Sequence, residues 1–276
     1  MVRKLLVSLG LIALAVAAAA CSSASTTTTT TAPATTTTLP TSPSSRNAQA
    51  ATRAMQAALG YGNRKSTVHY VDSASGGQLA TVIVGDIGQS SGIQTISIDF
   101  KGVRSSITIE LVGHTVYFKG GDEAVGLVFS LTPSQATAAA DRWVSIVPSE
   151  GAIFQQAAQA LTVGSLMSEI ALAKPITGMR AILMGGNTYT EIFGRWVGDG
   201  VLPREHATGE LVTTEGANSL PVEFSGVKPT EGISGRFVET VVLSRWGETV
   251  HIAVPRNALP LSSVLKAKST TKPTVV

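Results

Sequence analysis

The sequence predicts an α+β fold in which helices pack over one face of a large curled antiparallel sheet, a half-barrel. Three observations lead to this class. Helical and strand-like segments are separated along the chain rather than alternating, which is typical of α+β domains. Five strand-like runs follow one another with short turns, and such turns join only antiparallel strands. About eleven strands are expected, more than a flat open sheet usually holds, so the sheet should curl.

The chain begins with an export signal, predicted over residues 1–20. Arg3 and Lys4 precede an apolar stretch, and small residues follow at positions 17–20, where a signal peptidase cuts. Cys21, the only cysteine, comes directly after them. A lone cysteine at this place resembles the lipobox cysteine of bacterial lipoproteins, which carries a diacylglyceryl group. We therefore expect lipidation of Cys21; ordinary cleavage after Ala20, leaving a free thiol, is the alternative.

A stalk is predicted over residues 21–45, with one folded domain over residues 46–264 and a flexible basic tail over residues 265–276. From Ser22 to Ser45 the chain has 11 Thr, 6 Ser, 3 Pro, 3 Ala and one Leu, and no charge. Such a composition buries too little apolar area to offset the entropy of ordering, so we expect an extended stalk. Whether its threonines carry sugars is left open by the sequence.

The first part of the domain is predicted as one helix followed by five strands. A helix is expected at 46–59, ended by Gly60. The period then changes from helical to two, most clearly where Ile107, Ile109 and Leu111 alternate with polar residues. The strands are expected at 67–73, 80–87, 93–100, 105–112 and 115–119, separated by Gly- and Ser-containing turns.

The middle of the chain is predicted to be mainly helical, and its last third to return to strands. Helices are expected at 122–131, at 135–141 after a capping box that begins at Thr132, at 150–161 and, beginning at Ser165, at 166–173. A short strand is expected at 143–147. Further strands are expected at 179–184, 188–193, 209–214, 222–227, 236–245 and 249–254, with hairpin turns at 185–187 and 246–248.

Charge and composition exclude several classes of protein. The 276 residues include 21 Lys and Arg against 18 Asp and Glu, but five of the basic residues lie in the signal and the tail. The 16 basic residues left in 46–265 face 18 acidic ones, so a strongly basic nucleic-acid-binding domain is excluded and no nucleic-acid partner is expected. One cysteine also excludes an intramolecular disulfide framework and a Cys-rich zinc site.

Catalytic and cofactor motifs are weak throughout the sequence. The four histidines, His69, His114, His206 and His251, are scattered and form no HExxH or closely spaced ligand pair. There is no G-x-S-x-G, Walker loop or GxGxxG motif. We therefore expect no catalytic residues, no metal and no cofactor, and a protein that is not an enzyme.

Three segments carry recognisable local patterns. They are a turn and strand at residues 112–120 (VGHTVYFKG), a helix end that runs into a tryptophan strand at residues 139–144 (AADRWV), and an expected hairpin at residues 243–250 (LSRWGETV). All three resemble the corresponding segments of the actinobacterial LppX/LprAFG-type lipoproteins, in which the third is the final hairpin. The resemblance covers about residues 47–260. It implies a half-barrel on the extracytoplasmic face of the cell membrane that binds an acylated lipid or glycolipid and carries it through the cell envelope.

Alternation alone selects the residues expected to line an apolar interior. They are Ile96, Ile98, Ile107, Ile109, Leu111, Val241 and Leu243. An aliphatic interior suits acyl chains, because each Å² of apolar surface taken from water contributes about 25 cal/mol. Two other functions stay open. If the interior is filled by side chains, the domain is a cell-wall structural or interaction module; if a Ser–His or acid pair lies in a cleft, it is an envelope hydrolase. The ligand, protein partners and oligomeric state do not follow from the sequence.

Overall fold

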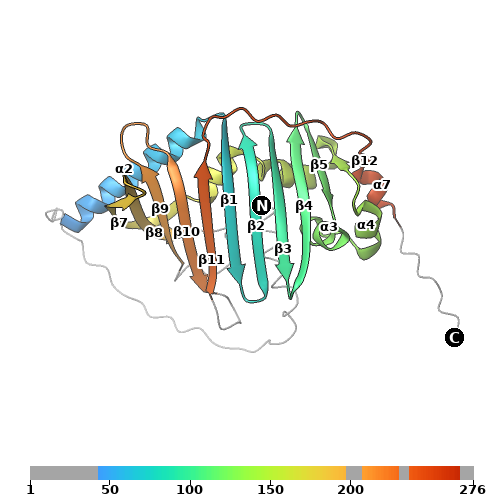
Figure 1. The fold of residues 1–276 in the computed structure, drawn as a ribbon, viewed down its shortest axis with the longest axis horizontal. Helices are drawn as coiled ribbons and strands as arrows, with labels where there is room; N and C mark the ends of the chain where they lie inside the picture. Colours follow the sequence, from blue (N-terminus) through green and yellow to red (C-terminus); the bar gives the residue numbers. More distant parts are fainter. Residues whose placement is uncertain (1–42, 197–206, 230–235, 268–276) are drawn as a thin grey trace, which may run out of the picture.

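The computed structural model describes residues 43–196, 207–229 and 236–267, and the statements below refer to these residues. Cys21, the signal and most of the predicted stalk lie outside them. Twelve strands form one open sheet, in the order β12-β6-β5-β4-β3-β2-β1-β11-β10-β9-β8-β7. The helices lie on one side of this sheet, behind the strands in Figure 1. The predicted α+β class with a curled antiparallel sheet is confirmed.

The strands in chain order are β1 (Thr67–Gly76), β2 (Leu79–Gly88), β3 (Gly92–Phe100), β4 (Val103–Val112), β5 (Thr115–Gly120), β6 (Val144–Ile146), β7 (Leu172–Met184), β8 (Asn187–Trp196), β9 (Thr208–Thr214), β10 (Pro221–Pro229), β11 (Arg236–Ser244) and β12 (Leu259–Pro260). The helices are α2 (Pro43–Asn63), α3 (Asp122–Phe129), α4 (Pro133–Ala139), α5 (Ala152–Gln159), α6 (Val163–Glu169) and α7 (Leu261–Leu265), with a 3-10 turn, η1 (Pro148–Glu150).

Two antiparallel meanders meet at the centre of the sheet. Strands β1 to β5 follow one another in space as in sequence, and so do β7 to β11. The two halves join where β1 pairs with β11, in a register that places Tyr70 opposite Leu243. The long-range β1–β11 pairing therefore makes one continuous sheet out of two local ones.

The face of the sheet toward the helices, here the inner face, carries the core. Along β1, Val68, Tyr70 and Asp72 are buried, whereas His69 and Val71 point to the opposite, outer face. One hydrophobic cluster joins inner-face residues of the strands to Ala51 and Met55 of α2, Val125 of α3 and Leu166 of α6. The core thus lies between a twelve-stranded sheet and a layer of helices.

Local signals in the sequence explain the starts of two helices, α4 and α6, whereas the end predicted at Gly60 is wrong because α2 continues to Asn63. The capping box predicted at Thr132 is confirmed, since its backbone N–H donates to Oε1 of Gln135 at 3.0 Å and Pro133 takes the first helical position. The predicted start of α6 at Ser165 is wrong by two residues. Thr162 caps this helix instead, accepting from the Ser165 backbone N–H at 3.3 Å, so α6 begins at Val163.

The strand predicted at 249–254 and its hairpin at 246–248 are wrong. β11 already has β1 on one side and β10 on the other, so no edge is left for a further strand. Arg245 and Gly247 have positive φ and turn the chain away from β11. Residues 245–258, here called the strap, run along the upper edge of the sheet in Figure 1 and lead to β12, which pairs in parallel with β6. β12 has only two residues, one of them Pro260, and does not follow from the sequence.

Within the described ranges, no helix has the length and apolar character needed to cross a membrane. The same residues contain no group of three or more His, Cys, Asp and Glu side chains that could hold a metal ion.

Candidate functional site

The seven residues selected by alternation lie on the inner face, in strands β3, β4 and β11. Ile96 and Ile98 belong to β3, Ile107, Ile109 and Leu111 to β4, and Val241 and Leu243 to β11. Their side chains are 0–5% exposed. The register places Ile96 opposite Ile107, whereas Val241 lies three strands away from Ile96.

A central row of mainly apolar residues crosses the inner face from β4 to β8. In register order it consists of Ile107, Ile96, Ile83, Asp72, Val241, Phe224, Leu211 and Ile192. Neighbouring strands lie about 4.8 Å apart, so eight strands give this row a length of about 34 Å. Only Asp72, at its middle and 1% exposed, interrupts the apolar sequence.

A second row lies two residues away from the central row on each strand, toward the same end of the sheet, and contains three glycines on adjacent strands. This glycine row places Gly194 of β8 opposite Gly209 of β9, which lies opposite Gly226 of β10. It continues through Glu239 to Ala74 of β1. Because three successive residues lack a side chain, this part of the inner face forms a trough beside the central row.

The trough is filled by Leu172 and Ile176 over Gly194, by Leu172 over Gly209, and by the indole of Trp196 over Gly226. A Cβ atom added at Gly226 would lie 2.6 Å from Cε3 of Trp196, and one at Gly209 would lie 3.2 Å from its Cβ. The ring centroid of Trp196 is 5.7 Å from that of Phe224 and 6.3 Å from that of Phe237. Gly226 therefore allows the indole of Trp196 to pack directly against the sheet, where this side chain is 2% exposed.

Buried charges lie beside this aromatic group. Lys228 places its Nζ 4.9 Å from the Trp196 ring centroid and 4.7 Å from that of Phe237. Lys228 on β10 and Glu239 on β11, the register partner of Gly226, are each 5% exposed. An aromatic face stabilises a desolvated cation. The interior thus combines a long apolar row with a polar, aromatic end.

The inner face is closely packed around four of its aliphatic side chains in the described structure. Ile96, Ile109 and Val241 have no exposed surface, and Ile107 has 1%. A side chain that lined a void large enough for water would retain accessible surface, so these four do not border such a void. A ligand could reach them only if the helical layer moved away from the sheet.

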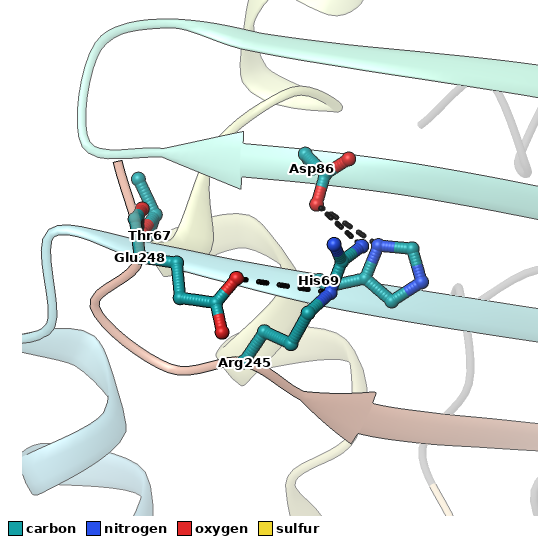
Figure 2. A network of polar contacts seen from close by, with 5 residues as sticks. All are labelled: Thr67, His69, Asp86, Arg245 and Glu248. Atoms are coloured by element: carbon teal, nitrogen blue, oxygen red, sulfur yellow. Dashed lines mark hydrogen bonds and ion pairs between the residues drawn. The ribbon is translucent and has the colours of Figure 1, made fainter. Parts of the chain in front are cut away.

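A polar network on the outer face fixes the start of the strap (Figure 2). Nδ1 of His69 lies 2.9 Å from Oδ1 of Asp86, and the guanidinium of Arg245 donates to the same oxygen at 3.3 Å. The hydroxyl of Thr67 donates to the backbone carbonyl of Glu248. The side chains come from β1, β2 and the strap, so the network joins the strap to two central strands.

This network borders a cavity of about 250 Å³, which also touches Ile93 and His251. The register places Ser244 of β11, His69 of β1 and Asp86 of β2 side by side. Serine, histidine and aspartate are also the three residue types of a hydrolase triad. In the described part of the chain, however, no hydrogen bond links Ser244 to His69, and Arg245 shares the Asp86 oxygen. The observed contacts are those of a structural clasp. His206, another of the four histidines, lies outside the described residues.

Glu110 is a buried carboxylate on the outer face of β4, between Ile93 of β3 and Tyr117 of β5. It is 7% exposed, and its Oε2 atom has no hydrogen-bond partner in the described structure. Desolvation raises the pKa of Glu110 above its ordinary value, because burial disfavours the ionised form.

The raised pKa of Glu110 makes stability depend on pH. The folded state binds the Glu110 proton more tightly than the unfolded state, so this contribution is complete below pH 4.5 and is lost as the pH rises through the folded-state pKa. Glu110→Gln cannot ionise, and we expect it to be more stable than the parent by about 1 kcal/mol at pH 7 and equal at pH 4. Urea unfolding at both pH values measures this, with exposed Glu215→Gln as control. A pH-independent difference would contradict it.

Sequence reasoning missed the glycine row and Trp196. Gly194 and Gly226 lie in the second halves of β8 and β10 and Gly209 near the start of β9, and only the register shows that the three are adjacent. Nothing in the sequence links Trp196 to Lys228, which lies 32 residues away on β10.

No protein-family model matches this sequence, and no curated protein matches it either. Several solved structures, however, are similar to this chain. The crystal structure of LprF from Mycobacterium bovis is similar with a TM-score of 0.45 and 14% identity, covering 75% of this chain and 97% of that one. The crystal structure of the Mycobacterium tuberculosis lipoprotein LppX is similar with a TM-score of 0.46 and 13% sequence identity, and the match covers 74% of this chain and 99% of that one. LppX and LprF are members of the family that the sequence resembles. The crystal structure of a DUF1329 family protein from Desulfovibrio piger matches with a TM-score of 0.24 and 12% sequence identity, over 75% of this chain and 95% of that one.

Proposed function

We propose that this chain is a lipid-anchored protein of the extracytoplasmic membrane face that binds an acylated lipid or glycolipid between its sheet and its helices and helps carry it through the envelope. The proposed anchor is Cys21, and residues 21–45 are proposed as the stalk that joins it to the domain at 46–264. Two or three acyl chains on one cysteine hold a protein firmly on a bilayer.

The central row is the observation that supports lipid binding. It offers an apolar path about 34 Å long. The hydrocarbon core of a bilayer is about 30 Å thick, and two acyl chains placed end to end span it, so the path is long enough for acyl chains. Seven of its eight residues are aliphatic or aromatic. An acyl chain laid along this path would be removed from water over its whole length, at about 25 cal/mol per Å².

The helical layer is suited to opening. Helices α3, α4, α5 and α6 have only 7 or 8 residues each. Isolated helices of this length are unstable in water, so their position depends on packing against the inner face. An acyl chain that replaces these contacts offers similar apolar surface in return. Binding would therefore part the helices from the sheet without unfolding the strands.

The experiment uses the exported chain with Cys21→Ala, purified without detergent. We expect this variant to leave the membrane fraction, and native mass spectrometry to show a bound acylated lipid. Lipids with brominated acyl chains should quench the fluorescence of Trp196, which packs against Phe224 of the central row. The same titration on Trp196→Phe should show much weaker quenching, because the remaining Trp143 and Trp246 lie outside the row.

Each readout can fail separately. Retention of Cys21→Ala in the membrane fraction would contradict the anchor but not the ligand. A lipid-free protein whose Trp196 is not quenched would contradict lipid binding. It would favour the second candidate function, a non-enzymatic interaction module of the cell wall, which the close packing of Ile96, Ile109 and Val241 supports.

A further inference from the structure

The hairpin of β7 and β8 ends in an exposed apolar tip. Residues 181–184 (Ala-Ile-Leu-Met) are four consecutive apolar residues, and Gly185 and Gly186, both with positive φ, form the turn after them. Leu183 is 73% exposed, the largest value among the large apolar side chains in the described ranges. A run of consecutive exposed apolar residues is unfavourable on a water-facing surface, so its presence points to a contact that covers it.

The tip is apolar on both faces of the hairpin. Leu183 pairs with Thr188 on the inner face, whereas Ile182 pairs with Tyr189 on the outer face. Ile182, Met184 and Tyr189 are only partly buried. A protein partner that covered one face of the sheet would leave the other face wet. An environment that surrounds the tip, such as the acyl region of a bilayer, covers both.

The N-terminal end of α2 lies beside this hairpin. Asn47 bonds the backbone of Met179 twice, accepting from its N–H at 3.2 Å and donating to its carbonyl at 3.4 Å. The last turn of the same helix reaches Met167, near the start of β7, so α2 and β7 run antiparallel. The chain therefore enters the domain at Pro43, next to the tip and 22 residues after Cys21.

The exposed side of α2 is basic. Arg46 and Arg53, seven residues apart, lie on one helix face with Gln49 between them, and all three are exposed. No Asp or Glu occurs anywhere in Pro43–Asn63. The nearby Arg180 is paired with Glu191 at 2.5 Å, so the uncompensated positive charge comes from the helix. Basic residues beside an apolar tip match an anionic bilayer surface.

We propose that this end of the domain, formed by residues 181–189 and the first three turns of α2, docks on an anionic lipid bilayer, with Leu183 entering the acyl region and Arg46 and Arg53 facing the headgroups. This is independent of cargo binding, because it uses none of the inner-face residues of the central row. It orients the tethered domain with the hairpin tip toward the membrane and α7, at the opposite end of the sheet in Figure 1, away from it.

The test places an environment-sensitive fluorophore on a single cysteine in the Cys21→Ala chain. With phosphatidylglycerol-containing vesicles, the label at Leu183→Cys should shift to the blue and brighten at least threefold, and it should respond much less to pure phosphatidylcholine. The label at Ser263→Cys, exposed on α7, should not respond. No change at position 183 with either vesicle, or equal changes at both positions, would overturn the proposal.

Charge and apolar contributions are tested by vesicle co-sedimentation. Leu183→Asp should weaken binding about tenfold, whereas Val254→Asp, at a strap residue that is 58% exposed, should not. Arg46→Glu with Arg53→Glu should remove the preference for phosphatidylglycerol. Arg142→Glu, at an exposed residue near the other end of the sheet, should keep it.

If Leu183→Asp leaves vesicle binding unchanged but converts a dimer to a monomer in sedimentation velocity, the tip is a contact between copies of this chain and the proposal fails. Quenching of Trp196 by brominated lipid is measured separately, so loss of cargo binding and loss of docking are distinguishable.

Discussion

Trp196→Ala is expected to lower the free energy of unfolding by about 3–5 kcal/mol, the range for truncating a large buried aromatic side chain. The indole is 2% exposed and lies over the glycine row, where Gly209 and Gly226 have no side chains to close the space it leaves. Lys228 would also lose one of the two aromatic rings beside its ammonium group. Both effects act in the same direction.

Urea unfolding followed by circular dichroism measures this loss. Trp196→Phe keeps an aromatic ring in the trough and should recover more than half of the stability. Trp246→Ala is the matched control, because Trp246 is only partly buried and its Nε1 donates to the Pro221 carbonyl at the surface end of the core. A loss below 1 kcal/mol for Trp196→Ala would show that the helices close over the trough on their own.

Gly226→Ala is expected to destabilise the fold by about 2–3 kcal/mol, as overpacking of a filled core does. The added Cβ would lie 2.6 and 2.7 Å from two atoms of the Trp196 indole, which must then leave its position. Gly178→Ala provides the control: it lies in β7, where the nearest atom to an added Cβ is 3.7 Å away, and it should change stability by less than 1 kcal/mol.

The two substitutions should be coupled. If the indole is what Gly226→Ala displaces, the double variant with Trp196→Ala should be more stable than the sum of the single effects predicts, by at least 1 kcal/mol. Additive losses in this double-mutant cycle would contradict direct contact as the cause. The same cycle tests whether the absence of a side chain at Gly226 is what accommodates the indole of Trp196.

Local sequence patterns predicted most of the elements because the signals themselves are local. The alternation of Ile107, Ile109 and Leu111 fixes one face of β4, and the turn at Gly185 and Gly186 fixes the β7–β8 hairpin. The capping box at Thr132 likewise needs only four residues. Each of these depends on neighbours within a few positions, which a single sequence displays directly.

Contacts between distant segments could not be predicted in the same way. Alternation places Val241 and Ile96 on a buried face, but their shared inner face depends on the pairing of β1 with β11, in which His69 meets Ser244 across 175 residues of chain. The error in the strap has the same origin. A segment such as Thr249–Val254 has strand character, and only the occupied edges of β11 prevent it from pairing there.

The candidate site shows a similar division. The apolar character of the interior follows from residue type, whereas its degree of filling depends on how the helices pack. The trough depends on three registers at once, because Gly194, Gly209 and Gly226 become neighbours only when β8, β9 and β10 are aligned. A shift of one residue in any pair would turn a glycine to the outer face.

The pairing of β1 with β11 also constrains how the sheet can form. β1 is complete at Gly76, but its second partner begins at Arg236, 160 residues later. Until β11 is in place, the backbone groups along one side of β1 have no strand to pair with, and an open edge of this kind can pair with strands of other chains. The two local sheets therefore protect the centre of the molecule only after they have met.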